Sequence, residues 1–272
     1  MPALDVNGIE LYYEDTGGDA PAVVFLHGAA GNHISWWQQI PTFRQRYRCI
    51  SIDHRGFGRS HDATGEGPER FVDDLESLLE HLGVEQTALV AQSMGGRTAL
   101  GFAVRHPGRV TALVMADTWG FFDWPELQEE AQRLREEQGA NDAPLQERAL
   151  GRTFQEREPT LTFLYQQIAG LNPPRDLRRM SAGAPTREQV EALDLPVLFL
   201  VGSEDPLTPP AILHRVHEVI EGSEYVEFEG LGHSVYFEDG PGFNEVVGDF
   251  LARNVAGEMA AMEPAAGEAA SR

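Results

Sequence analysis

The chain is poor in cysteine, contains no lysine and has no long apolar run. Its single cysteine, Cys49, excludes an internal disulfide, and its place in the apolar stretch YRCISID predicts an inert core thiol. The apolar runs fall well short of the roughly 20 residues of a membrane-spanning helix. The opening stretch MPALDVNGIELYYEDTGG lacks a basic segment followed by an apolar one, so we expect no signal peptide and a cytoplasmic protein.

Charge of one sign dominates the composition. All 21 basic residues are arginine, and 43 acidic residues bring the formal net charge to −22. Such a surface repels nucleic acid and anionic membranes, so we expect neither as a partner. The sequence has no phosphate loop, dinucleotide fingerprint or CxxC motif, so we expect no cofactor. His214, His217 and Glu218 have the spacing of a metal site, but we interpret them as the exposed face of a late helix.

What the chain does have is a regular alternation of buried strands and helices. With 272 residues, 42% of them hydrophobic, it can form one large core. Nearly continuous apolar runs predict strands covered on both faces, and the stretches between them have helical spacing. We therefore predict an α/β fold with a doubly wound, mostly parallel sheet. The stretch GIELYYEDTG at 8–17 alternates like an exposed strand, and the other expected strands are 22–28, 47–53, 87–92, 110–117, 196–202 and 224–230. The expected helices are 68–82, 94–107, 209–220 and 241–255.

One region interrupts this alternation. Residues 118–193 contain charged and apolar stretches with helical spacing but no convincing strand. This predicts a helical lid inserted into a core formed by 1–117 and 194–255. Residues 256–272 are low in large apolar side chains and are expected to form a disordered tail.

The stretch LVAQSMGGRTAL places Ser93 between a buried strand and a helix. A sharp turn there would project the serine above the sheet and would require small neighbours, here Ala91 and Gly95. The backbone N–H of Met94, at the start of the helix, could then stabilise an oxyanion. The alternative is that Ser93 only caps the helix.

A serine nucleophile needs a histidine base and a carboxylate that orients it. Asp205 and His233 both follow the ends of later predicted strands, and the chain order Ser93, Asp205, His233 is that of α/β-hydrolases. Ala29, in HGAAGN after an early strand, is the expected second oxyanion donor. Asp117, at the end of the strand 110–117, is a rival for the acid; otherwise we expect it to cap the first lid helix.

These motifs resemble the α/β-hydrolase superfamily over roughly residues 5–255, in particular its cap-bearing esterases and lactone hydrolases. The stretches that carry the resemblance are HG at 27–28, DHRGFGRS at 53–60, AQSMGG at 91–96, GSEDPLTPP at 202–210 and GHSVYFED at 232–239. Ala91 replaces the commoner glycine of the turn, which sterics allow. The serine argues against the similar haloalkane dehalogenases and epoxide hydrolases, which use an aspartate there.

Other residues have two interpretations each. We expect His27, Asp53 and Arg55 to hold loops in place and not to react. Arg97 could point to the sheet edge or to solvent, or it could bind a substrate carboxylate. In the second case the chain would resemble 3-oxoadipate enol-lactone hydrolase or the menaquinone-pathway synthase, a lyase. Aromatic side chains near both loops could line an apolar pocket or pack the lid on the core; we name Trp119 and Phe122 as candidate substrate contacts and assign Trp36 and Trp37 to core packing.

The sequence thus predicts a serine hydrolase that cleaves a small or medium carboxylic ester or lactone through an acyl-enzyme. Two other hypotheses remain open, a lyase that uses the same three residues as acid and base, and a ligand sensor with little turnover. The substrate's identity and the oligomeric state are not predicted.

Overall fold

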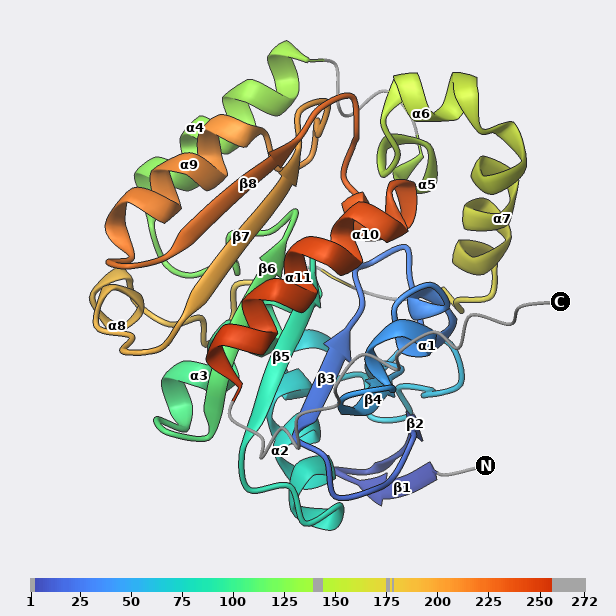
Figure 1. Cartoon of the computed structure of the whole chain (residues 1–272), viewed down its shortest axis with the longest axis vertical. Helices are drawn as coiled ribbons and strands as arrows, with labels where there is room; N and C mark the ends of the chain where they lie inside the picture. Colours follow the sequence, from blue (N-terminus) through green and yellow to red (C-terminus); the bar gives the residue numbers. More distant parts are fainter. Residues whose placement is uncertain (1–2, 139–143, 175–176, 178, 256–272) are drawn as a thin grey trace, which may run out of the picture.

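The computed structural model describes residues 3–138, 144–174, 177 and 179–255 and contains one eight-stranded sheet flanked by helices (Figure 1). The strand order is β1-β2-β4-β3-β5-β6-β7-β8. Strand β2 pairs antiparallel with both β1 and β4, and the remaining neighbours, β4-β3-β5-β6-β7-β8, all pair in parallel. This confirms the predicted fold class. The strands are β1 (Ala3–Val6), β2 (Ile9–Asp15), β3 (Ala22–Leu26), β4 (Arg48–Ile52), β5 (Thr87–Gln92), β6 (Val110–Ala116), β7 (Val197–Gly202) and β8 (Glu224–Phe228).

The central strands are buried along their whole length. Every residue of β3, β5 and β7 is buried, because helices cover both faces of the sheet. The one strand that we did not predict, β1, forms a hairpin with β2 around Asn7 and Gly8, whose φ angles of 47° and 78° suit a tight two-residue turn.

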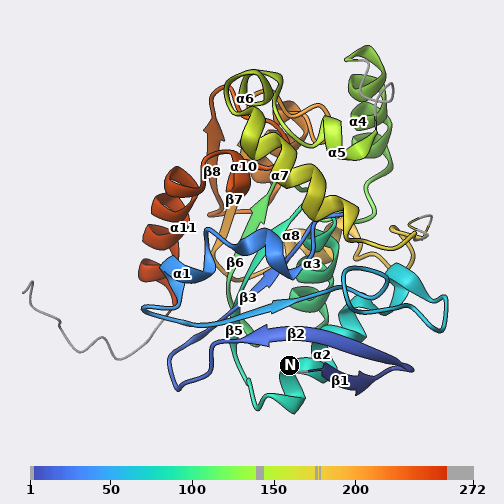
Figure 2. The same cartoon turned by 90° about the vertical axis from the view of Figure 1, so that its right-hand side faces the viewer.

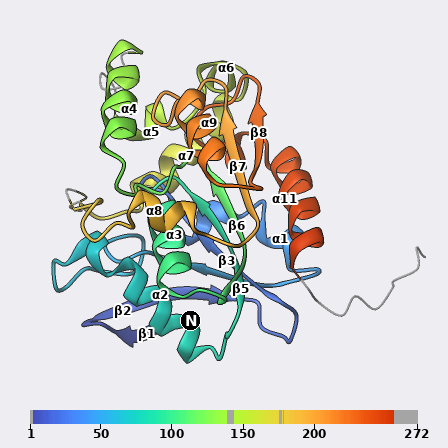
Figure 3. The same cartoon turned by 90° about the vertical axis from the view of Figure 1, so that its left-hand side faces the viewer.

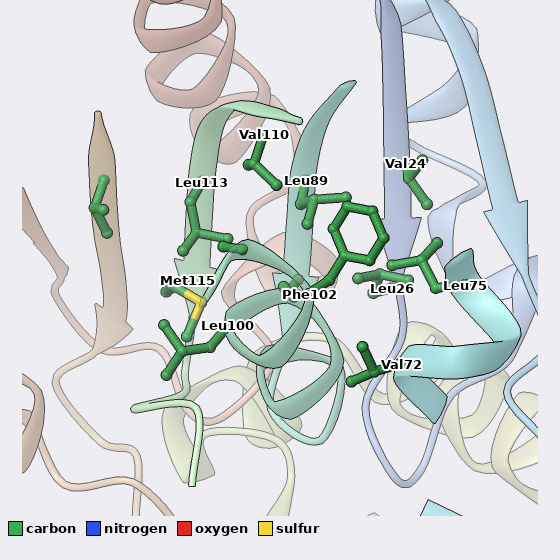
Figure 4. Close-up of a cluster of buried hydrophobic side chains, with 14 of the residues drawn as sticks. Val24, Leu26, Val72, Leu75, Leu89, Leu100, Phe102, Val110, Leu113 and Met115 are labelled. Atoms are coloured by element: carbon green, nitrogen blue, oxygen red, sulfur yellow. The ribbon is translucent and has the colours of Figure 1, made fainter. Parts of the chain in front are cut away.

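Helices from different parts of the chain cover the two faces, as Figures 2 and 3 show. One face carries α2 (Phe71–His81), α3 (Gly95–Arg105) and α9 (Pro210–Val219), and the other carries α1 (Ile40–Phe43) and α11 (Gly240–Asn254). In Figure 4, Phe102 of α3 points toward Leu89 of β5 and lies near Leu75 of α2. This interleaving of helix and sheet side chains forms the larger of the two cores.

The segment expected to be a lid contains five described helices and, within 118–138, 144–174, 177 and 179–193, no strand. They are α4 (Pro125–Glu137), α5 (Leu145–Arg148), α6 (Arg152–Arg157), α7 (Pro159–Gly170) and α8 (Arg187–Glu191). In Figure 2, α4, α6 and α7 lie at the end of the sheet to which the parallel strands point. The segment is therefore placed over the edge where α/β proteins gather their functional side chains.

Three shorter elements complete the described fold: η1 (His33–Trp36), η2 (Gly67–Arg70) and α10 (Val235–Glu238). Residues 256–272, where we expected a disordered tail, lie outside the described residues. Across the part of the chain that is described, the helices are too short or too polar to cross a membrane.

Candidate active site

Ser93 occupies the sharp turn between β5 and α3. Its φ of 48° lies in the left-handed region, which is costly for a residue with a side chain. A Cβ on Gly95 would lie 2.1 Å from the carbonyl oxygen of Leu26, so the chain needs glycine at this point. Ala91 is fully buried. The crowding predicted for this turn is therefore confirmed at Gly95.

The structure brings Ser93, His233 and Asp205 into one hydrogen-bonded chain. Ser93 Oγ lies 2.7 Å from His233 Nε2, and His233 Nδ1 lies 2.8 Å from Asp205 Oδ2. Asp205 Oδ1 accepts hydrogen bonds from the backbone N–H groups of Leu207 and Thr208, which hold the carboxylate in place. In this arrangement the imidazole can take a proton from the hydroxyl while the carboxylate steadies the resulting cation.

The helix-cap interpretation of Ser93 is wrong. The N-cap of α3 is Met94, and no side chain caps this helix. The Ser93 hydroxyl is instead directed to His233, 140 residues later in the chain.

The loop after β3 lies directly against Ser93. A Cβ on Gly28 would lie 3.0 Å from the Cβ of Ser93, and the next residue, Ala29, packs in a small apolar cluster with Met94. His27 holds the loop, because its Nε2 accepts from the N–H of His54, so its Nδ1 donates to the carbonyl of Gly28. Both expected oxyanion donors thus come from segments that adjoin the serine.

Side chains from several elements hold the loop that carries His233. Its carbonyl oxygen accepts from Gln92 Nε2 at 2.6 Å, and the hydroxyl of the next residue, Ser234, lies 3.0 Å from Tyr165 Oη of α7. Glu238 accepts from the N–H groups of Gly232 and Ser234, on either side of the histidine. Sequence reasoning missed Gln92 and Glu238; the available signal for Glu238 was one acid in the apolar stretch SVYFE.

Asp117 also contacts the loop that carries His233, but it is neither the acid that orients the histidine nor a helix cap, the two roles predicted for it. Its oxygens accept from the N–H groups of Gly202 and Val235, whereas the partner of His233 is Asp205. It does not cap the first lid helix, since α4 begins only at Pro125. Burial, reinforced by the charge of Asp205, raises the pKa of the Asp117 carboxyl well above its usual value.

The motif DHRG is structural, as expected. Asp53 accepts from the ring of His33 and the N–H of Arg59, which outweighs its burial and lowers the pKa of the carboxyl. Arg55 is buried and forms an ion pair with Asp74 at 2.8 Å. Neither side chain is directed to Ser93 in these contacts.

Arg97 is buried and its guanidinium donates to the backbone carbonyls of Met180 and Ala182. These bonds tie α3 to the last part of the 118–193 segment and do not support the expectation that Arg97 holds a substrate carboxylate. Trp119 and Phe122 are buried in the core cluster beside α3 and α4, which favours packing of the 118–193 segment on the core over substrate contact for both.

The predictions for two tryptophans and two histidines can be checked against the exposure of their side chains. Trp36 is fully buried, but Trp37 is 43% exposed, so its assignment to core packing was wrong; its ring makes an edge contact with the buried ring of Phe237. His214 lies on the exposed face of α9, and His217 stacks on Tyr225. Among the described residues no cluster of His, Cys, Asp or Glu could hold a metal ion.

Cys49 is buried as predicted, and its burial raises the pKa of the thiol to about 12. It is therefore unreactive at neutral pH.

Comparisons with known proteins agree with this fold. A family model described as "alpha/beta hydrolase fold" matches residues 21–240. A 3-oxoadipate enol-lactonase of Acinetobacter baylyi is 29% identical, over 83% of this chain and 90% of the relative. Two similar solved structures are a thermophilic esterase from Thermogutta terrifontis (TM-score 0.80, 26% identity, 93% and 99% of the two chains) and an enol-lactonase from Burkholderia xenovorans (TM-score 0.74, 25% identity, 92% and 100%). Each of these relatives spans most of this chain.

Proposed function

Because the chain belongs to the alpha/beta hydrolase fold family, we propose that it is a serine hydrolase acting on small or medium carboxylic esters or lactones. The observation that carries this proposal is the continuous chain of hydrogen bonds from Ser93 Oγ through His233 to Asp205. The esterase and enol-lactonase names of the similar proteins favour an ester or lactone bond as the target.

The proposed reaction has two halves. Ser93 Oγ attacks the acyl carbon while His233 Nε2 takes its proton, and the same proton then passes to the leaving alkoxide as the C–O bond breaks. A water molecule next gives its proton to His233 and attacks the acyl-enzyme, and the serine regains its proton as the acid leaves. In a lactone the leaving alcohol stays joined to the acid, so one product forms.

The negative charge on the tetrahedral intermediate needs donors beside the serine. We assign this role to the backbone N–H groups of Met94 and Ala29, since Met94 directly follows Ser93 and the loop of Ala29 lies against the serine. Such donors act most strongly where water is excluded, and Met94 is 1% exposed.

The test is a burst assay with p-nitrophenyl acetate and butyrate. The intact protein is expected to release nitrophenol rapidly, and Ser93→Ala and His233→Ala, checked for folding by circular dichroism, are expected to release none above background. Mass spectrometry of the quenched reaction should find the acyl group on Ser93.

The two other hypotheses predict different results in the same assay. A lyase would bind ligand and turn over without an acylated serine, and a sensor would bind without turnover. Folded protein that shows neither a burst nor an acylated serine would therefore contradict the hydrolase proposal.

A further inference from the structure

Three backbone N–H groups converge on the side chain of Glu238. Gly151 donates to Oε2 at 2.9 Å, Gly232 donates to both oxygens at 2.9 and 3.1 Å, and Ser234 donates to Oε1 at 3.2 Å. The side chain lies on α10, and the residue is only 6% exposed. One buried carboxylate therefore satisfies donors from two loops, one in the 118–193 segment and one in the core.

The two loops touch through their backbones. A Cβ on Gly232 would lie 2.1 Å from the nitrogen of Gly151, and a Cβ on Gly151 would lie 2.7 Å from the nitrogen of Gly232. Only glycine at both positions permits this approach. The approach brings both N–H groups within reach of the same carboxylate.

Each loop leads to a different part of the molecule. Gly232 and Ser234 flank His233, whereas Gly151 immediately precedes α6 of the 118–193 segment. A second contact joins α6 to the core, because Thr153 donates its N–H and its hydroxyl to Glu204, the neighbour of Asp205. The start of α6 is thus connected to both loops that carry the His–Asp pair.

Burial and three hydrogen bonds act in opposite directions on the charge of the Glu238 carboxyl. Burial raises the pKa of its carboxyl to about 7, although the three N–H groups favour the charged form. The other titratable groups that face it are Asp205, Asp117, Tyr165, Tyr236 and the adjoining His233. A neutral acid in this place would accept fewer N–H bonds and would add an O–H donor of its own.

We propose that Glu238 is a positioning residue that couples the docking of α6 to the orientation of His233. While its carboxylate accepts from both loops, the histidine stays aligned with Ser93 and the start of α6 stays against the core. The consequence for catalysis rests on the proposed hydrolase function; the mechanical coupling between the two loops does not.

The test uses Glu238→Gln, which keeps the size of the side chain but replaces one acceptor oxygen with an NH₂ donor. We expect kcat for p-nitrophenyl butyrate to fall about 10- to 100-fold, as for small misplacements of a catalytic group, with a much smaller change in KM. Hydrogen exchange should speed up together at the amides of Gly151, Gly232 and Ser234 in the folded variant.

Two control variants each touch one side of the coupling. Asp117→Asn loosens the His233 loop through Val235 and is expected to lower kcat without faster exchange at Gly151. Thr153→Val removes a lid contact of the same α6 start and is expected to speed exchange around residue 153 with kcat changed less than about twofold.

A fall in global stability with kcat per folded molecule and Gly151 exchange both as in the intact protein would overturn the proposal. If Glu238→Gln does not fold, the amide NMR shifts of Gly151, Gly232 and Ser234 in the intact protein decide the matter. They should titrate with one shared midpoint near the pKa of Glu238, and separate midpoints would contradict the coupling. Neither exchange nor shift depends on turnover, so a protein without esterase activity would contradict only the proposed function.

Discussion

The turn that carries Ser93 and the loop that carries His233 meet at one hydrogen bond, but they are held in different ways. The turn is shaped by local sterics, with a strained φ at Ser93 and a glycine two residues later that nothing larger can replace. The loop is held by side chains from other elements, namely Gln92, Asp117, Tyr165 and Glu238. The crowding of the turn can be predicted from the small residues around one serine, whereas the contacts that hold the loop cannot be predicted from any one stretch of the sequence.

The largest effect is expected where the two regions meet. Ser93→Ala and His233→Ala should each lower kcat by about 10⁴-fold or more, and the double variant should be little worse than either, because the residues act as a unit. Steady-state kinetics on the three variants measures this. Losses that multiply in the double variant would show that the two side chains work independently.

Breaking the turn alone should affect folding. Gly95→Ala places a Cβ against the backbone oxygen of Leu26, which cannot swing away, so we expect a loss of about 3 kcal/mol in the free energy of unfolding. Urea denaturation measures it.

Gly101→Ala, in the same helix, is the control for Gly95→Ala. There the added Cβ meets only the end of the Val72 side chain, and alanine favours the helix, so stability should stay within about 1 kcal/mol of the parent. Equal losses in both variants would mean that the turn is not sterically special.

The contacts that hold the His233 loop should make the free energy of unfolding depend on pH. Glu238 has a folded-state pKa of about 7 against a usual 4.5, so the folded chain binds a proton there that the unfolded chain has released. This group therefore makes the protein less stable as pH rises from 4.5 to 7, by at most about 3 kcal/mol, and adds no further change above that.

The Glu238→Gln variant lacks this titration. The stability of the parent minus that of the variant should fall between pH 4.5 and 7 and then level off, as measured by urea denaturation at each pH. A difference that is flat, or that rises over this range, would contradict the raised pKa.

The smallest effect is expected at Arg97. If its bonds to Met180 and Ala182 are its role, Arg97→Met should change KM by less than about threefold, and equally for neutral and carboxylate-bearing esters. A selective rise in KM for the carboxylate-bearing ester would restore the binding role that the sequence suggested.

Patterns in the amino-acid sequence were enough to predict the alternation of strands and helices, the turn at Ser93 and the order of the residues that follow it. Apolar periodicity and small residues around one serine are local properties, and they predict the same local geometry wherever they occur. The expected strands therefore lie within about two residues of those observed, for example 87–92 for β5.

The choice between Asp205 and Asp117 as the partner of His233 was settled by the folded chain, as were the contacts of Arg97, Trp37 and Glu238. These outcomes depend on which backbone donors are buried together, and such donors come from loops that are distant in sequence. Gly151 and Gly232 illustrate the reason: Gly151 belongs to none of the motifs and Gly232 belongs to GHSVYFED, yet their N–H groups share one acceptor only because the folded chain brings the two loops into contact.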